Sequence, residues 1–125
     1  MRVIGLDHLV MICSDVDASL DYYGGVLGLE TIDVDEWRSG RALFPSVRLN
    51  EASIIDLLPG KPDGRNVDHI CLVIEPTDLH ELAKRRELNV VEGPVQRSGA
   101  RGTGWSIYVT DPDAHVIELK QYSAD

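Results

Sequence analysis

The sequence contains little of what would direct it to a membrane, to nucleic acid or into a disulfide framework. It has two cysteines in 125 residues, and 12 Lys and Arg against 21 Asp and Glu give a net charge of −9. No apolar run approaches the roughly 18 residues needed to span a bilayer. Because an acidic chain is repelled by phosphate backbones and anionic lipid, we expect neither nucleic acid nor membrane as a partner.

The two cysteines, Cys13 and Cys71, lie inside apolar segments and lack the spacing of a disulfide framework. This use of cysteine is typical of a reducing compartment. Strand-type residues begin directly after Met1, so we expect no signal peptide. These features predict a cytoplasmic protein.

What the chain does contain is an internal repeat, and such repeats dominate the interpretation of a sequence. Asp7-His8-Leu9-Val10-Met11-Ile12 recurs as Asp68-His69-Ile70-Cys71-Leu72-Val73, and Ile54-Ile55-Asp56-Leu57 recurs as Val116-Ile117-Glu118-Leu119. Each half of the chain therefore opens a strand with a histidine and closes another strand with a carboxylate.

Hydrophobic periodicity and turn residues predict the same order of elements in both halves. The first half has a strand over residues 3–12, a helix over 17–27 and strands over 29–37, 42–49 and 53–58. The second half has a strand over residues 67–74, a helix over 78–87 capped by Thr77 or Asp78, and strands over 90–91, 105–109 and 115–122. Residues 99–104 are predicted to form a loop and residues 111–114 a turn.

The Pro- and Gly-rich residues 59–66 indicate a linker between the two halves. We therefore predict one α+β domain over residues 1–125. It contains two tandem βαβββ repeats, residues 1–58 and residues 67–125.

Two imidazoles and two carboxylates at repeat-equivalent positions predict a metal site. This donor set suits one divalent transition metal, namely Mn, Fe, Ni, Co or Zn, and does not suit calcium. The alternative is structural: His8 and His69 would be buried and hydrogen-bonded, and Glu118 would form a salt bridge at a strand end. Repeat equivalence favours the metal site, least clearly at Asp56.

The same residues carry a resemblance to a known family. The repeated βαβββ unit resembles the vicinal oxygen chelate superfamily, which includes glyoxalase I, fosfomycin resistance enzymes, extradiol dioxygenases, methylmalonyl-CoA epimerase and bleomycin resistance proteins. The matching strings are Asp7-His8-Leu9-Val10, Tyr22-Tyr23 with Val26-Leu27-Gly28-Leu29-Glu30, and Asp111-Pro112-Asp113 with Val116-Ile117-Glu118-Leu119. The resemblance implies a curled, U-shaped mixed sheet with helices outside and the metal inside the trough.

The resemblance also implies roles for individual residues. The implied metal ligands are His8, Asp56, His69 and Glu118, and Asp56 is the weak match because its side chain is short. Ser106 and Tyr108 are implied to contact the substrate. Positive charge for an anionic substrate could come from an arginine, with Arg97 preferred over Arg41, Arg48 and Arg101, and Trp37 and Trp105 could enclose the substrate. A metal-bound carboxylate could act as general base, and between Asp56 and Glu118 the longer reach favours Glu118.

Three functions are compatible with this set of residues. The first is a metal-dependent lyase, isomerase or thiol transferase, in which the metal acts as a Lewis acid on a small oxygen-rich substrate. The second is an extradiol-type Fe(II) dioxygenase, which needs two histidines and one carboxylate, so that Asp56 as a ligand would count against it. The third is a bleomycin-resistance-like protein that binds a cationic drug without turnover. The acidic charge favours this third function and the complete ligand set argues against it.

A two-repeat chain leaves sheet edges exposed, and members of the resembled family commonly pair as homodimers. We therefore expect a homodimer with two sites.

Overall fold

The computed structural model describes residues 1–125 except 27, 65–66, 111–113 and 123–125, and it divides into two compact units. Unit 1 comprises Met1–His8 and His69–Asp125, and unit 2 comprises Leu9–Asp68. Strand β1 (Val3–Cys13) begins in unit 1 and ends in unit 2. Its ends have different partners, because Glu75 N–H donates to the Arg2 carbonyl at 2.8 Å and Gly60 N–H donates to the Cys13 carbonyl at 3.0 Å. The first eight residues therefore belong structurally with the second predicted repeat.

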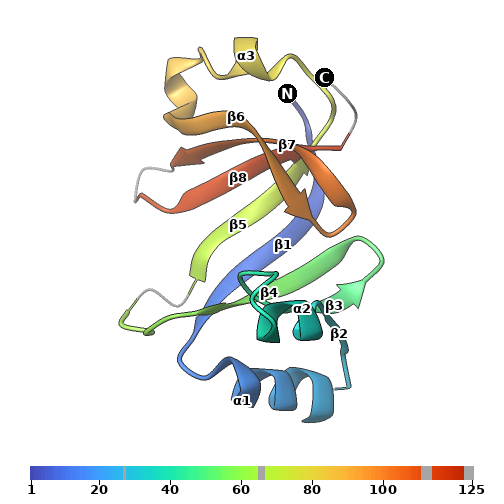
Figure 1. The fold of residues 1–125 in the computed structure, drawn as a ribbon. Coiled ribbons are helices and arrows are strands. Elements are labelled where there is room, and N and C mark those ends of the chain that lie inside the picture. The colour runs from blue at the N-terminus through green and yellow to red at the C-terminus, as the bar shows by residue number, and fades with distance from the viewer. Residues whose placement is uncertain (27, 65–66, 111–113, 123–125) are drawn as a thin grey trace. The chain divides into compact units, whose positions relative to one another are not determined.

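Unit 1 is a mixed sheet with a helix on one face (Figure 1). Its strands are hydrogen-bonded in the order β1, β5 (Val67–Ile74), β8 (Val116–Gln121), β7 (Gly102–Thr110) and β6 (Val90–Gly99). Strands β5 and β8 are parallel, whereas β7 is antiparallel to both of its neighbours. Helix α3 (Leu79–Leu82) and the 3₁₀ turn η2 (Arg86–Leu88) lie in sequence between β5 and β6.

One face of this sheet forms the hydrophobic core of unit 1. Leu79 and Leu82 of α3 pack with Ile107 of β7 and Leu119 of β8, and all four side chains are at most 5% exposed. Side chains alternate between the two faces of a strand. Glu118, next to Leu119, therefore points to the face opposite the helix, and this face carries the candidate site.

Unit 2 contains a second sheet segment with its own core. The strand order is β2 (Glu30–Ile32), β3 (Ser46–Asn50), β4 (Ser53–Pro59) and the end of β1. Helix α1 (Val16–Leu20) continues as the π-helix η1 (Asp21–Val26), and α2 (Val34–Arg38) lies between β2 and β3. The core consists of Cys13, Val16, Leu20, Val47 and Leu57. The order β1-β4-β3-β2 thus recurs as β5-β8-β7-β6, and the predicted α+β class with a mixed sheet is confirmed.

Several predicted elements have different bounds in the structure. The strand predicted over residues 29–37 is wrong, because Asp33 adopts the left-handed conformation (φ 60°) and divides this segment into β2 and α2. The helix predicted over residues 17–27 is α1 followed by a π-helix, and the strand predicted over residues 42–49 begins at Ser46. The strands predicted over residues 53–58 and 67–74 are confirmed within one residue.

The second half also differs from its prediction, in the hairpin formed by β6 and β7. The strand predicted at residues 90–91 extends to Gly99 as β6, and the loop predicted over residues 99–104 is a tight turn into β7, with Gly99 opposite Gly102. The predicted cap is confirmed, since the Asp78 carboxylate accepts from the N–H groups of His80 and Glu81. Of the turn predicted at residues 111–114, residues 111–113 lie outside the described residues, as do residues 65–66 of the predicted linker.

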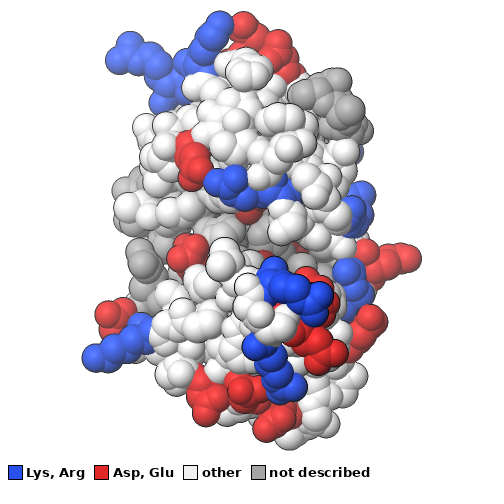
Figure 2. Space-filling view, in the orientation of Figure 1, with Lys and Arg blue, Asp and Glu red and all other residues white. Residues whose placement is uncertain are grey.

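Exposed charges of opposite sign lie next to one another on the surface. Arg38 pairs with Asp17 at 2.7 Å and Arg97 pairs with Glu92 at 2.7 Å. Figure 2 shows basic and acidic side chains side by side on one face of the molecule. In the part of the chain that the structure describes, no helix combines the length and the apolar character required to cross a membrane.

Candidate metal centre

Three of the four predicted metal ligands converge in unit 1. The Nε2 atoms of His8 in β1 and His69 in β5 lie 3.2 and 3.1 Å from the same oxygen, Oε1, of Glu118 in β8. Candidate ligand atoms of the three side chains all lie within 4.8 Å of one another. His8 and Glu118 are buried, and the His69 side chain is 14% exposed. Two imidazoles and one carboxylate directed at one point form a donor set that fits a divalent transition metal.

The topology of unit 1 explains this convergence, because β1, β5 and β8 are consecutive strands of its sheet. In the parallel pair of β5 and β8, Cys71 lies opposite Glu118. His69 is two residues before Cys71 and therefore shares its face of β5. Strand pairing therefore brings His8, His69 and Glu118 together, although they lie far apart in the sequence.

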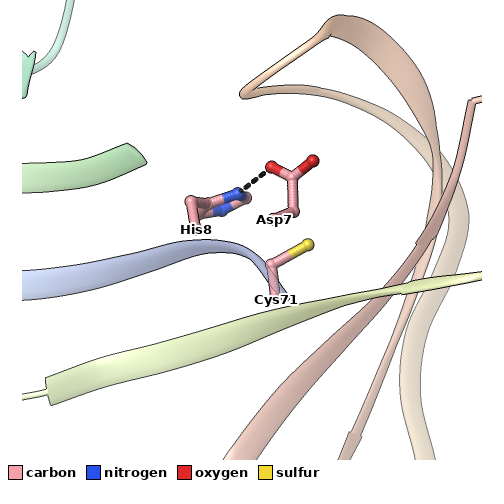
Figure 3. A group of neighbouring side chains, drawn as sticks. All are labelled: Asp7, His8 and Cys71. Carbon is pink, nitrogen blue, oxygen red and sulfur yellow. Dashed lines mark hydrogen bonds and ion pairs between the residues drawn. The ribbon is translucent and has the colours of Figure 1, made fainter. Parts of the chain in front are cut away.

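Asp7 sets the orientation of the His8 ring (Figure 3). The Nδ1–H group of His8 donates to Oδ1 of Asp7 at 2.6 Å, which directs the opposite ring nitrogen, Nε2, toward Glu118. Asp7 is 0% exposed and also accepts from Ala100 N–H at 2.8 Å and from the hydroxyl of Tyr122. Burial opposes ionisation of Asp7, but these three donors outweigh it and lower the pKa of the carboxyl.

Both oxygens of Glu118 have polar partners. Oε1 faces the two imidazoles, Oε2 accepts from the Ser106 hydroxyl at 2.7 Å, and the Lys120 ammonium lies 3.6 Å from Oε2. Burial alone would raise the pKa of Glu118, but the hydrogen bonds from His69, His8 and Ser106 hold it well below its usual range. Glu118 is therefore an ionised carboxylate, as a metal ligand has to be.

The metal-free chain neutralises this buried charge with a proton on His8. Burial favours neutral imidazole, but the hydrogen bonds to Asp7, Cys71 and Glu118 outweigh it and raise the pKa of His8 to about 12. A metal ligand must be a neutral imidazole, so metal binding at this site would release a proton.

Cys71 makes a second group of candidate ligands with Asp7 and His8 (Figure 3). Burial raises the pKa of its thiol to about 11, which disfavours the thiolate that a metal requires. Asp7 and Nδ1 of His8 are also already joined by a hydrogen bond. The set of His8, His69 and Glu118 therefore fits a metal better. Cys71, like Cys13, is buried and outside any disulfide.

Of the three predicted substrate contacts, Ser106 and Tyr108 contact candidate ligands, and Arg97 lies beside Tyr108. Ser106 is 0% exposed, and its hydroxyl donates to Glu118, a candidate ligand. The Tyr108 ring makes an edge contact with His69, with 5.8 Å between ring centroids, and the Arg97 guanidinium lies 5.8 Å from the Tyr108 ring. Burial and the charge of Glu118 raise the pKa of Tyr108 to about 12, which keeps its hydroxyl a neutral donor.

The remaining predicted residues have surroundings of their own. Asp56 belongs to unit 2, where it is 6% exposed and accepts from the Ser46 hydroxyl at 2.5 Å. Its role as a fourth ligand stays a prediction. Trp37 and Trp105 pack against the hydrophobic cores of units 2 and 1, respectively, so their observed contacts are structural.

The sequence did not predict the residues that contact the candidate ligands or Asp7, namely Asp7 itself, Lys120 and Tyr122. For Asp7 a signal was present, since an aspartate precedes the histidine in both repeats. For Lys120 and Tyr122 there was none, because lysine is mostly exposed and tyrosine is found both buried and exposed.

Comparison with known proteins agrees with this fold. The family model of the Glyoxalase/Bleomycin resistance protein/Dioxygenase superfamily matches residues 5–119. The chain is 35% identical over 132 residues to the glyoxalase domain-containing protein RDO1 of Mycosarcoma maydis, a match that covers 98% of this chain and 70% of that protein. It is 30% identical over 126 residues to the virulence protein STM3117 of Salmonella typhimurium, with 98% of this chain and 87% of that protein covered.

A solved structure supports the fold alone. It is a variant of methylmalonyl-CoA epimerase from Streptomyces coelicolor in complex with 2-nitronate-propionyl-CoA, with a TM-score of 0.66 and 20% identity, covering 98% of this chain and 100% of that chain. On the family match and the identity to RDO1, the chain belongs to the Glyoxalase/Bleomycin resistance protein/Dioxygenase superfamily.

Proposed function

We propose that this protein is a metal-dependent enzyme that acts as a lyase, isomerase or thiol transferase on a small oxygen-rich substrate. His8, His69 and Glu118 would hold one divalent transition metal, namely Mn, Fe, Ni, Co or Zn. The observation that carries the proposal is the approach of both Nε2 atoms to within 3.2 Å of one buried carboxylate oxygen. Identity of 35% to a glyoxalase domain-containing protein supports a glyoxalase-type enzyme.

The residues around the ligands have distinct tasks in this proposal. When bound, the metal would supply Lewis-acid stabilisation of negative charge on a substrate oxygen. The Tyr108 ring makes an edge contact with His69, and its neutral hydroxyl can donate a hydrogen bond to that substrate. Arg97 lies beside the Tyr108 ring with its side chain 42% exposed and can approach an anionic group.

Glu118 is better suited to hold the metal than to accept the substrate proton. Its first oxygen faces both imidazoles, and the Ser106 hydroxyl donates to its second oxygen at 2.7 Å. A general base has to reach the substrate proton at hydrogen-bond distance, and both oxygens of Glu118 already have partners. We therefore propose Glu118 as a ligand and keep Asp56 as the alternative for the base.

An extradiol-type Fe(II) dioxygenase is the second candidate function. The observation in its favour is that unit 1 brings together two histidines and one carboxylate, the ligand set of non-haem Fe(II) oxygenases. Oxygen uptake by the Fe(II)-loaded protein with a catechol would favour this candidate. Conversion of a thiol–carbonyl adduct or an epoxide by the Mn-, Ni- or Zn-loaded protein, without oxygen uptake, would favour the first.

The first experiment is elemental analysis of protein purified without added metal. The wild type is compared with His69→Ala and with the matched control His80→Ala, which removes an exposed histidine of α3 in the same unit. We expect about one transition metal per chain in the wild type and the control, and loss of that metal in His69→Ala.

Absence of metal from the wild type, even after anaerobic reconstitution, would contradict the proposal. Stoichiometric binding of a cationic drug without turnover would then favour the bleomycin-resistance-like function. Sedimentation of the same samples tests the proposed homodimer.

A further inference from the structure

His8 and Glu118, the two buried candidate ligands of unit 1, each contact a residue that in turn contacts one hairpin. This hairpin joins β6 to β7, and its end is defined here as Arg97–Gly102. One set of contacts leads from the hairpin end to His8, and another leads to Glu118.

The first set of contacts passes through Asp7. Backbone N–H of Ala100, in the hairpin turn, donates to Oδ1 of Asp7 at 2.8 Å, and the same oxygen accepts Nδ1–H of His8 at 2.6 Å. Tyr122, directly after β8, donates its hydroxyl to the other oxygen of Asp7. It also accepts from Arg101 N–H at 3.2 Å and so joins the turn a second time. Asp7 thus has a fixed position and cannot rotate without breaking several hydrogen bonds.

The second set of contacts passes through Lys120. The Lys120 ammonium donates to the Arg97 carbonyl at 2.6 Å and lies 3.6 Å from Oε2 of Glu118. The side chain of Lys120 is 0% exposed, and its ammonium lies 5.6 Å from the centre of the Tyr122 ring. A buried ammonium needs partners of this kind, because an unpaired buried charge is strongly destabilising.

Gly99 has no side chain, which allows Asp7, Lys120 and Tyr122 to pack closely against the hairpin. A Cβ atom at this position would lie 2.6 Å from Oδ1 of Asp7 and 2.7 Å from Cε of Lys120, and would also collide with the Tyr122 hydroxyl. Any side chain at Gly99 would therefore displace residues that support the ligands.

We propose that the end of the β6–β7 hairpin positions two metal ligands, His8 through Asp7 and Tyr122 and Glu118 through Lys120, and thereby slows release of the metal. The inference rests on the proposed metal site. In this arrangement Asp7, Tyr122 and Lys120 are positioning residues, because each acts through a ligand or through Asp7. Partners of this kind commonly change metal affinity by about 10–100-fold.

The test measures binding and release of Co(II), with the metal alone as probe and a chelator as competitor. Three variants remove one partner each: Asp7→Asn, Tyr122→Phe and Lys120→Met. Three matched controls make the same chemical change at exposed sites: Asp17→Asn, Tyr22→Phe and Lys84→Met, whose side chains are 59%, 52% and 72% exposed. Unfolding of each metal-free variant is recorded separately, so that release is compared under conditions where every chain is folded.

We expect Asp7→Asn to raise the dissociation constant for Co(II) about 10–100-fold. Tyr122→Phe and Lys120→Met should raise it less, through faster release, and the controls should match the wild type. The effects of Asp7→Asn and Tyr122→Phe should not be additive, because Tyr122 acts through Asp7. The visible spectrum of bound Co(II) should also change in Asp7→Asn, since the orientation of one imidazole changes.

Two outcomes would overturn the inference, and they are distinguishable. If the wild type binds Co(II) and the three variants bind and release it in the same way, the contacts are only structural, even if the variants unfold more easily. If the wild type binds no metal, the proposed function fails as well. Tyr122→Phe keeps the test decisive if Asp7→Asn does not fold, because it removes only one hydroxyl.

Discussion

Replacing Gly99 with alanine should destabilise the metal-free protein although it adds a single methyl group. The new Cβ atom would lie 2.6 Å from Asp7 Oδ1 and 2.7 Å from Lys120 Cε, where real Cβ contacts are longer than 3.0 Å. Both neighbours are fully buried and hydrogen-bonded, so neither can move away without loss of a bond. Overpacking of this kind costs about 1–3 kcal/mol.

Gly5→Ala is the matched control, because a Cβ atom at Gly5 would meet nothing within 4 Å. Neither glycine has a positive φ, so the backbone accepts alanine at both positions and only the packing differs. At Gly5 the substitution should leave the free energy of unfolding unchanged or raise it by up to about 1 kcal/mol.

The assay is urea unfolding of both metal-free variants and the wild type, followed by far-UV circular dichroism. With a slope of about 1–3 kcal/mol per molar urea, Gly99→Ala should lower the midpoint by about 1 M at unchanged slope. Equal midpoints for Gly99→Ala and the wild type would refute the close packing of Asp7, Lys120 and Tyr122 around the hairpin.

Two further predictions concern a helix cap and pH. Asp78→Ala should lower the free energy of unfolding by about 0.5–2 kcal/mol, because the carboxylate caps α3 through the N–H groups of His80 and Glu81, while metal content stays unchanged. The free energy of unfolding of the metal-free protein should also depend on pH. The pKa of Glu118 is lowered from 4.5, so its stabilisation is present above pH 4.5 and is lost as pH falls. The pKa of His8 is raised from 6.5 to about 12, so its stabilisation is complete below pH 6.5 and is lost as pH rises toward 12. Denaturation between pH 3 and 9 should therefore show these two groups contributing most between about pH 4.5 and 6.5, and a flat profile would contradict their burial as a charged pair.

The repeat in the sequence indicated the histidines and Glu118 as candidate ligands, because a metal site would need particular side chains at equivalent places in each repeat. Strand periodicity then indicated which side chains share a face. The prediction was poorer where glycine and irregular backbone decide the structure. Residues 99–104, expected to be a loop, form the turn of the hairpin that contacts Asp7 and Lys120.

The sequence by itself determined the order of the strands, the α+β class and the candidate ligands, since each of these follows from local periodicity and from residue type. Only the tertiary structure decided which atoms meet. Ser106 donates to Glu118, Asp7 accepts from His8 and from Tyr122, and Lys120 lies beside Glu118. Asp7 and Ala100 are 93 positions apart, and Asp7 and Tyr122 are 115 positions apart. No local pattern encodes such pairs, because they arise only when strand pairing brings both ends of the chain into one sheet.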